Sequence, residues 1–182
     1  MAITRKVVVY EFLTLDGVAE DNSRFFVGED DAEVDAVGAD VIATQDAVIL
    51  GRRSYDEWVT FWPNSDIEPF ASFINKVPKY VATSTPLDVD WAGATAIDGE
   101  LVDFVRELKD KPGGDIGVHA SISVAQTLLA AGLVDELRLI VAQQIAGSGR
   151  KLLDGLPPIR LASTRTAVSA TGFLLLDYRV VG

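Results

Sequence analysis

The 182-residue chain contains no cysteine and one histidine, His119. The absence of cysteine excludes a disulfide framework, thiolate metal sites and a cysteine nucleophile. With one histidine, metal ligation would depend on carboxylates. No Ser-His-Asp triad can be argued either, because no nucleophile or orienting acid is identifiable for that histidine. We therefore expect no bound metal ion.

Clusters of basic side chains are also missing. The chain has 16 Lys and Arg against 27 Asp and Glu, a formal net charge of −11, and no basic residue stands between Arg24 and Arg52. Binding to a phosphate backbone requires Lys and Arg clustered on one face. We therefore expect no nucleic-acid partner.

Long apolar runs suited to a membrane are scarce. The uncharged stretch 116–134 approaches the ~20 residues of a membrane helix, but serines, Gln126 and glycines interrupt it. A strand end, a loop and a short buried helix explain it better. Near the N-terminus, Glu11 interrupts an apolar run that superficially imitates a signal peptide. We expect a cytoplasmic protein that makes no membrane contact.

Hydrophobic residues are abundant, at 48%, which is enough for a sizeable core in one domain spanning 1–182. Apolar and amphipathic segments alternate up to Ala142, as in alternating strands and helices. Two extended runs, 160–168 and 173–181, then predict an antiparallel hairpin. The predicted fold is a three-layer α/β domain, a mixed central sheet flanked by helices with a C-terminal antiparallel hairpin. The expected strands lie at 7–13, 47–50, 80–83, 94–97, 116–118 and 137–142, and the expected helices start near Asp31, Gly51, Asp98 and Ser121, the last two as caps.

No Gly-x-Gly-x-x-Gly or Walker A pattern occurs, which disfavours a standard Rossmann or P-loop protein. The junction Gly51-Arg52-Arg53-Ser54 instead places two cations and a hydroxyl where a strand gives way to a helix. A helix N-terminus presents unpaired N–H groups to an anion, so the junction suits a phosphate. Thr83-Ser84, at another strand end, adds hydroxyl donors. The alternative is a solvated arginine pair that balances an acidic surface.

A second strand-to-helix junction spans 118–122. Its small residues Ala120 and Ser121 would let a ligand approach the backbone closely and meet another helix N-terminus. Two such junctions could hold both halves of a dinucleotide. The alternatives are ordinary helix capping by Ser121 and, for His119, a structural hydrogen bond at a strand end.

Two carboxylates are candidate catalytic groups, because a carboxylate beside a reacting imine or carbonyl can supply a proton or orient water. Asp16 follows the first strand, and its alternative role is that of an Asp-Gly turn residue. Asp31, with Asp35, stands at the start of the first helix, where the alternative is a solvated acidic face.

The order of these features resembles the dihydrofolate reductase-like superfamily, and most closely the reductase domain of the riboflavin-pathway deaminase-reductase proteins in a stand-alone form. Each mark is weak alone, but the series follows family order across nearly the whole chain. A zinc deaminase half would need a His/Cys/Cys cluster, so this chain without cysteine resembles the reductase half only. The marks are the runs 14–19, 50–55, 77–84, 119–121, 132–137 and 147–153.

The resemblance implies NADPH as the cofactor and direct hydride transfer to a heterocycle. By position, Gly51, Arg52, Arg53 and Ser54 would hold phosphates. Arg52 or Arg53, together with Ser84, would read the 2′-phosphate.

The resemblance also places the rest of the cofactor. Thr83 would lie beside the adenosine, and the loop from Asp16 to Ala19 would lie over the nicotinamide. His119, Ala120, Ser121 and Ile122 would approach the pyrophosphate and nicotinamide. Relatives usually carry Gly-Gly or Gly-Ser where this chain has Ala120-Ser121, and the added methyl group reduces the room for pyrophosphate.

The predicted function is NADPH-dependent reduction of a pyrimidine- or pterin-like substrate, related to 5-amino-6-(5-phosphoribosylamino)uracil reduction in riboflavin biosynthesis. Asp16 or Asp31 would protonate or polarise that substrate. The alternatives are a dihydrofolate reductase and a nucleotide- or flavin-binding relative without reductase turnover. We expect a homodimer, because resembling proteins are often dimers and an exposed terminal sheet edge would gain from pairing.

Overall fold

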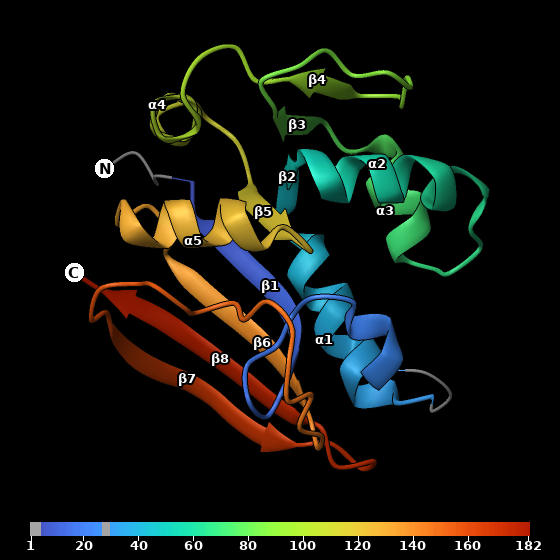
Figure 1. Cartoon of the computed structure of the whole chain (residues 1–182), viewed down its shortest axis with the longest axis vertical. Helices are drawn as coiled ribbons and strands as arrows, with labels where there is room; N and C mark the ends of the chain where they lie inside the picture. The colour runs from blue at the N-terminus through green and yellow to red at the C-terminus, as the bar shows by residue number, and fades with distance from the viewer. Residues whose placement is uncertain (1–4, 27–29) are drawn as a thin grey trace.

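The computed structural model describes residues 5–26 and 30–182. Over these two ranges the chain forms an eight-stranded sheet, five α-helices and two short 3-10 helices (Figure 1). The strands are β1 (Val7–Thr14), β2 (Gln45–Gly51), β3 (Lys79–Ala82), β4 (Ala94–Ala96), β5 (Asp115–His119), β6 (Glu136–Ala142), β7 (Arg160–Val168) and β8 (Leu174–Val181). The helices are α1 (Ala32–Ala43), α2 (Arg52–Phe61), α3 (Phe70–Lys76), α4 (Leu101–Lys109) and α5 (Ile122–Ala130), with 3-10 turns at Asn22–Phe25 and Trp62–Asn64.

The sheet is mixed, in the order β4-β3-β2-β5-β1-β6-β8-β7. The six strands from β4 to β6 in this order pair in parallel, whereas β8 and β7 run antiparallel to their neighbours. The predicted α/β fold with a C-terminal antiparallel hairpin is confirmed. The parallel strands end at one edge of the sheet, which is where open α/β sheets bind ligands.

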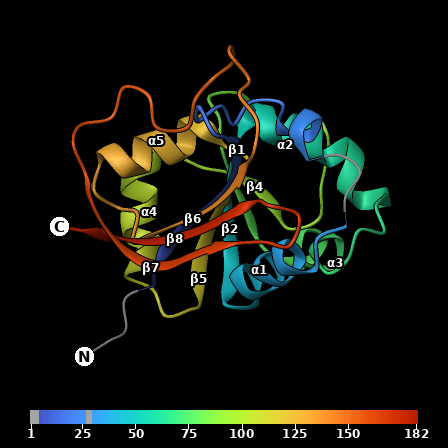
Figure 2. The ribbon, with the colours of Figure 1, turned by 90° about the horizontal axis from the view of Figure 1, so that it is seen from below.

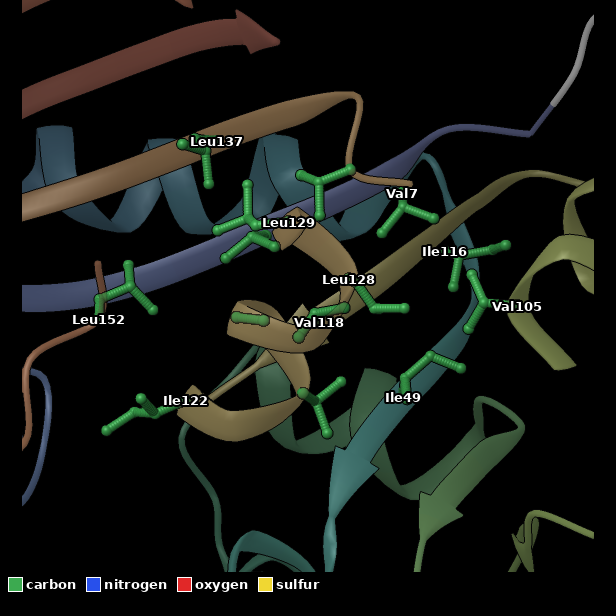
Figure 3. Packing of buried hydrophobic residues seen from close by; sticks show 14 of the residues in the cluster. Val7, Ile49, Val105, Ile116, Val118, Ile122, Leu128, Leu129, Leu137 and Leu152 are labelled. Carbon is green, nitrogen blue, oxygen red and sulfur yellow. The ribbon is translucent and has the colours of Figure 1, made fainter. Parts of the chain in front are cut away.

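Helices cover both faces of the sheet, which gives the three predicted layers (Figure 2). On one face, Val7 and Ile116 pack with Val105 of α4 and Leu128 of α5 (Figure 3). Neighbouring strand residues point the other way, where clusters built around β1 and β2 pack against α1, α2 and α3. This alternation follows from the two-residue period of a strand. Each large aliphatic side chain buried in this way contributes roughly 1.5–3 kcal/mol.

Two local predictions differ from the structure. Helix α3 was not predicted, because its seven residues are too few to form a stable helix alone. It forms because Ala71 and Ile74 are buried against the sheet. The predicted cap Asp98 is wrong: the N-cap of α4 is Glu100, and Gly99, with a φ of 89°, turns the chain between Asp98 and the helix.

The uncharged stretch 116–134 contains most of β5, the whole of α5 and the loops around them, as predicted. No helix within the described ranges combines the length and apolar character required to cross a bilayer.

Candidate functional site

A cavity of about 770 Å³, here called the first cavity, lies at the carboxyl edge of the parallel strands. The first turns of α2 and α5 form two of its walls, and the loop after β1 forms another. Most of the predicted cofactor residues thus meet in one place. Those that line the first cavity are Ala19, Gly51, Arg52, Arg53, Ser54, Ala120, Ser121 and Ile122.

Both helices begin without a side-chain cap. The N-cap of α2 is Gly51, and the N-cap of α5 is Ser121, whose hydroxyl makes no capping hydrogen bond to its own helix. The first backbone N–H groups of each helix therefore have neither an intrahelical partner nor a side-chain acceptor. They lie at the positive ends of the helix dipoles. Two such termini on one cavity favour a ligand with two anionic groups.

The serine hydroxyls connect the two junctions to each other. The Gly51 N–H donates to Ser121 Oγ (3.0 Å), Ser121 Oγ donates to Ser54 Oγ (3.1 Å), and Ser54 Oγ donates to the Ala120 carbonyl (2.6 Å). Both serines are buried. Their hydroxyl protons are thus used within the protein, and a phosphate here would be held by backbone N–H groups instead.

Ala120 has a φ of 48°, in the left-handed region that favours glycine. A non-glycine residue there costs about 1–2 kcal/mol of backbone strain. The hydrogen bond from Ser54 to the Ala120 carbonyl helps to hold this conformation. The strained residue lies at the point where the ligand would approach the backbone most closely.

Arg52 is held by several partners within the chain. Its Nε donates to Asp56 (2.9 Å), its Nη1 to Thr85 Oγ1 (2.5 Å) and the Pro86 carbonyl (2.9 Å), and its Nη2 to Asp88 (2.6 Å). Arg52 therefore fastens α2 to the loop after β3. A phosphate that bound this guanidinium would replace one of the two carboxylates.

Arg53 is more available to a ligand. Its side chain is 66% exposed, with single contacts to Glu57 (3.1 Å) and Glu20 (3.0 Å). Such exposed ion pairs are weak and are readily exchanged. Thr83 Oγ1 lies 3.4 Å from Arg52 Nη1, and Ser84 is exposed and is not among the residues that line the first cavity.

Two further arginines, which sequence reasoning did not assign to the site, line the first cavity. They are Arg24, on the loop after β1, and Arg150, whose Nη2 donates to Ser123 Oγ (2.7 Å) in the first turn of α5. With Arg52 and Arg53 they give four cations against three acidic residues in this wall, on a chain with an overall charge of −11. The glycine turn at 147–149 before Arg150 was the sequence signal, and its spacing alone did not identify a site.

A second cavity of about 370 Å³ joins the first along Asn22, Trp58 and Ala120. Its walls come from β1, α1, α3 and the end of α2, and they are mostly apolar and aromatic. Such a cavity suits a flat ring. The two cavities together can take a dinucleotide and a ring compound side by side.

His119 lines the second cavity and not the first. It is buried, and its Nε2 shares a 2.8 Å hydrogen bond with Gln45 Oε1. Burial lowers the pKa of His119 to about 4, so the ring is neutral at pH 7. Gly117 makes room for the pair, because a Cβ there would lie 2.1 Å from Gln45 Oε1.

Glu11 is the acidic residue that sequence reasoning missed. It lines the second cavity with 1% of its surface exposed, and its Oε1 is buried without a hydrogen-bond partner. Burial raises the pKa of Glu11 to about 8, although backbone N–H groups of Ser121, Phe12 and Ala120 partly oppose this shift. The signal was present in the sequence: an acid in an otherwise apolar strand must be neutral or paired.

The two predicted catalytic acids both accept several hydrogen bonds from the chain. Asp16 accepts hydrogen bonds from Thr14 Oγ1 (2.6 Å) and from the N–H groups of Ala146 and Gly147 (both 2.9 Å), and these bonds lower its pKa to about 2. It lines none of the cavities described here. An acid with this pKa is ionised at pH 7 and has no proton to donate.

Asp31 is the N-cap of α1 and accepts from the N–H groups of Glu33 (3.0 Å) and Val34 (3.1 Å). The hydroxyls of Ser169 and Thr171 lower its pKa to about 2, so it too is ionised. Asp31 lines a third cavity of about 470 Å³, which adjoins the second along Phe12, Val34 and Asp35. No group of three His, Asp or Glu residues suited to a metal ion occurs in 5–26 or 30–182.

Comparison with known proteins gives distant but extensive similarity. A curated relative, the uncharacterized protein YyaP of Bacillus subtilis, is 28% identical over 96% of this chain and 94% of its own. A candidate riboflavin biosynthesis protein from Shewanella sp. PV-4 has a TM-score of 0.81 at 18% identity, covering 97% of this chain and 99% of that one.

Two further solved structures share the fold. A deaminase/5-amino-6-(5-phosphoribosylamino)uracil reductase from Thermotoga maritima has a TM-score of 0.69 at 14% identity, with 98% of this chain covering 57% of that one. Dihydrofolate reductase from Enterococcus faecalis in complex with NADP(H) has a TM-score of 0.63 at 14% identity, covering 99% and 97% of the two chains. The model of the RibD C-terminal domain matches residues 5–175. The chain therefore belongs to the RibD C-terminal domain family, and its fold is that of the dihydrofolate reductase-like reductases.

Proposed function

We propose that this protein is an NADPH-dependent reductase that transfers a hydride to a pyrimidine- or pterin-like substrate. The observation that carries the proposal is the pair of uncapped helix N-termini facing one arginine-lined cavity that opens into an aromatic cavity. The named activities of the uracil reductase and of the NADP(H)-bound dihydrofolate reductase support it.

The residues present fit a phosphorylated dinucleotide. The first turns of α2 and α5 would hold the phosphates through backbone N–H groups, because the Ser54 and Ser121 hydroxyls are engaged with each other. Arg53, and Arg52 after release of a carboxylate, would favour a 2′-phosphate and hence NADPH over NADH. When bound, the nicotinamide supplies the hydride.

Glu11 would supply the proton. Reduction of a ring C=N bond adds a hydride to carbon and a proton to nitrogen. Glu11 keeps its proton at neutral pH, lines the cavity for the ring, and lies near Ala120, which lines both cavities. Asp16 and Asp31 remain ionised and would act by holding the loop after β1 and the start of α1 in place.

Fluorescence titration with NADPH and NADH tests the cofactor assignment. NADPH should bind markedly more tightly than NADH, and Arg53→Ala should weaken NADPH at least tenfold while changing NADH little. Arg106→Ala is the matched control, because Arg106 is an exposed arginine of α4 paired with Asp103 outside the cavities. Unchanged NADPH affinity in both Arg52→Ala and Arg53→Ala contradicts the phosphate assignment.

One feature favours a second candidate, a nucleotide-binding relative without turnover. Ala120 has a positive φ and lines the first cavity, where its methyl group would reduce the room for a pyrophosphate. Cofactor binding without reduction of any pyrimidine or pterin would support this candidate, and visible absorbance of the purified protein would indicate a flavin ligand.

Tight pterin binding with competition by methotrexate would instead indicate dihydrofolate reduction.

We also propose a homodimer. Strand β7 forms one edge of the sheet, and its Leu161 and Val168 are exposed. An exposed apolar edge gains stability from pairing. Light scattering on the protein as it elutes from a gel-filtration column measures its mass in solution, which should be twice the mass of one chain.

A further inference from the structure

The second and third cavities, on the substrate side of the site, are acidic. Glu68 lines the second, Asp31 lines the third, and Asp35 lines both. Glu11 also lines the second, but burial raises its pKa to about 8, so it carries little charge at pH 7. Among the described residues that line these two cavities there is no Lys or Arg. The only histidine, His119, is neutral at pH 7.

The cations of the site all lie on the other side. Arg24, Arg52, Arg53 and Arg150 line the first cavity. Arg24 is the one next to the substrate side, and there it is paired with Asp21 (3.0 Å) and lies over the ring of Phe25. Charge is thus distributed unevenly along the site. Four arginines and three acidic residues line the cavity of the proposed cofactor. Asp31, Asp35 and Glu68 line the cavities of the proposed substrate, with no Lys or Arg among the described lining residues.

This separation decides which substrates the site can take. A phosphate group in the second or third cavity would be removed from water beside carboxylates and would find no cation to pair with, which is strongly unfavourable. The third cavity offers Gln143 and Gln144 amides, the Asp35 carboxylate and a stacked pair of rings, Phe26 and Phe173, 5.1 Å apart. Amides and carboxylates accept hydrogen bonds from amino and hydroxyl groups.

We propose that the substrate of this reductase carries no phosphate, and that the group it extends into the third cavity is neutral or cationic, with hydroxyl or amino donors. The inference rests on the proposed function and departs from the phosphoribosyl substrate named for the Thermotoga maritima reductase. The chain shares the fold of that enzyme, but the described residues that line its second and third cavities include no cation for that group.

A matched pair of ligands tests the inference: 5-amino-6-(ribosylamino)uracil and its 5′-phosphate. Trp58 and Trp62 line the second cavity, so binding of either ligand should quench tryptophan fluorescence. The phosphate-free compound should bind about tenfold more tightly or better at low salt. The difference should shrink at high salt, because screening weakens the repulsion.

Substitutions of acidic residues test whether the charge of Asp35 causes the preference for the phosphate-free ligand. Asp35→Asn should reduce the preference for the phosphate-free ligand at least threefold, and Asp35→Lys should reverse it. Asp40→Asn is the control, because Asp40 is an exposed acid of the same helix that lines neither cavity. Equal affinity, preference for the phosphate, or no binding of either ligand overturns the inference. NADPH titration of the same samples tests the proposed function separately, since the first cavity does not depend on Asp35.

Discussion

Replacing Glu11 with glutamine should make the stability of the protein less sensitive to alkaline pH. The carboxyl is buried, and its pKa is raised from 4.5 to about 8 in the folded state. Between these two values the folded state keeps a proton that the unfolded state has released, so the wild-type protein loses stability as the pH rises. The loss is about 1.4 kcal/mol per pH unit while the folded carboxyl keeps its proton. Because half of it has ionised at pH 8, the loss amounts to about 2.3 kcal/mol between pH 6 and pH 8.

Urea unfolding of both proteins at pH 6, 7 and 8 measures this difference. The other titratable groups on the same cavity are present in both proteins, so their effects on the free energy of unfolding cancel in the comparison. His119 is neutral between pH 6 and pH 8, because burial lowers its pKa, and burial raises the pKa of Tyr10 above this range. The free energy of unfolding of Glu11→Gln, relative to that of the wild type, should therefore rise by about 2.3 kcal/mol from pH 6 to pH 8. Glu107→Gln, on the exposed face of α4, should follow the wild type.

Parallel curves for wild type and Glu11→Gln would refute the reasoning, because they would mean that Glu11 loses its proton at an ordinary pH. The same variant should reduce turnover by roughly a hundredfold or more with unchanged NADPH affinity, the usual range for loss of a general acid.

Three other substitutions test separate features. Gly117→Ala should destabilise the protein by about 2–3 kcal/mol in urea unfolding, because the new Cβ would displace the Gln45 side chain from its hydrogen bond with His119. Gly132→Ala is the control: it has open space around its Cβ, so it should lower the free energy of unfolding by only about 1 kcal/mol, for its positive φ. Ala120→Gly should tighten NADPH binding by removing the methyl group, and weaker NADPH binding would contradict this prediction. The free energy of unfolding should change by less than about 1 kcal/mol, because relief of backbone strain offsets the added freedom of the unfolded chain. Lys79→Met should cost about 1–3 kcal/mol at pH 7, because the buried ammonium donates to two carbonyls at the end of α3. Burial lowers the pKa of Lys79 to about 8, so the wild type should gain stability between pH 8 and pH 10, and the variant should lack this gain.

Strand positions were predictable because they depend on short-range pattern. The runs beginning at Val7 and Arg160 carry the composition and spacing of strands, and turn residues end them. The junctions at Gly51 and Ser121 were predictable for the same reason, since a strand that gives way to a helix exposes the helix N-terminus wherever it occurs.

The roles of individual side chains were not predictable, because they depend on partners far away in the sequence. The sequence suggests Arg52 as a phosphate ligand, but it does not show that Asp88, 36 residues later, accepts a hydrogen bond from its guanidinium. Ser121 reads as a helix cap, but Gly51, 70 residues earlier, donates to its hydroxyl. The sequence suggests Asp16 as a proton donor, but it does not show that the backbone N–H of Ala146 donates to its carboxylate. In each case the residue type indicates what the side chain can do chemically, but its contact partner is determined by the fold.

The hydrogen-bonded link through Ser54 and Ser121 has a mechanical consequence. It joins the start of α2 to the start of α5, so the separation of the two helix ends is set before any ligand arrives. A ligand with two anionic groups that matches this separation would lose little conformational entropy from the protein on binding. One that does not match would have to break buried hydrogen bonds to fit. The proposed dinucleotide would therefore be selected by the distance between its anionic groups, which has to match the fixed separation of the two helix ends.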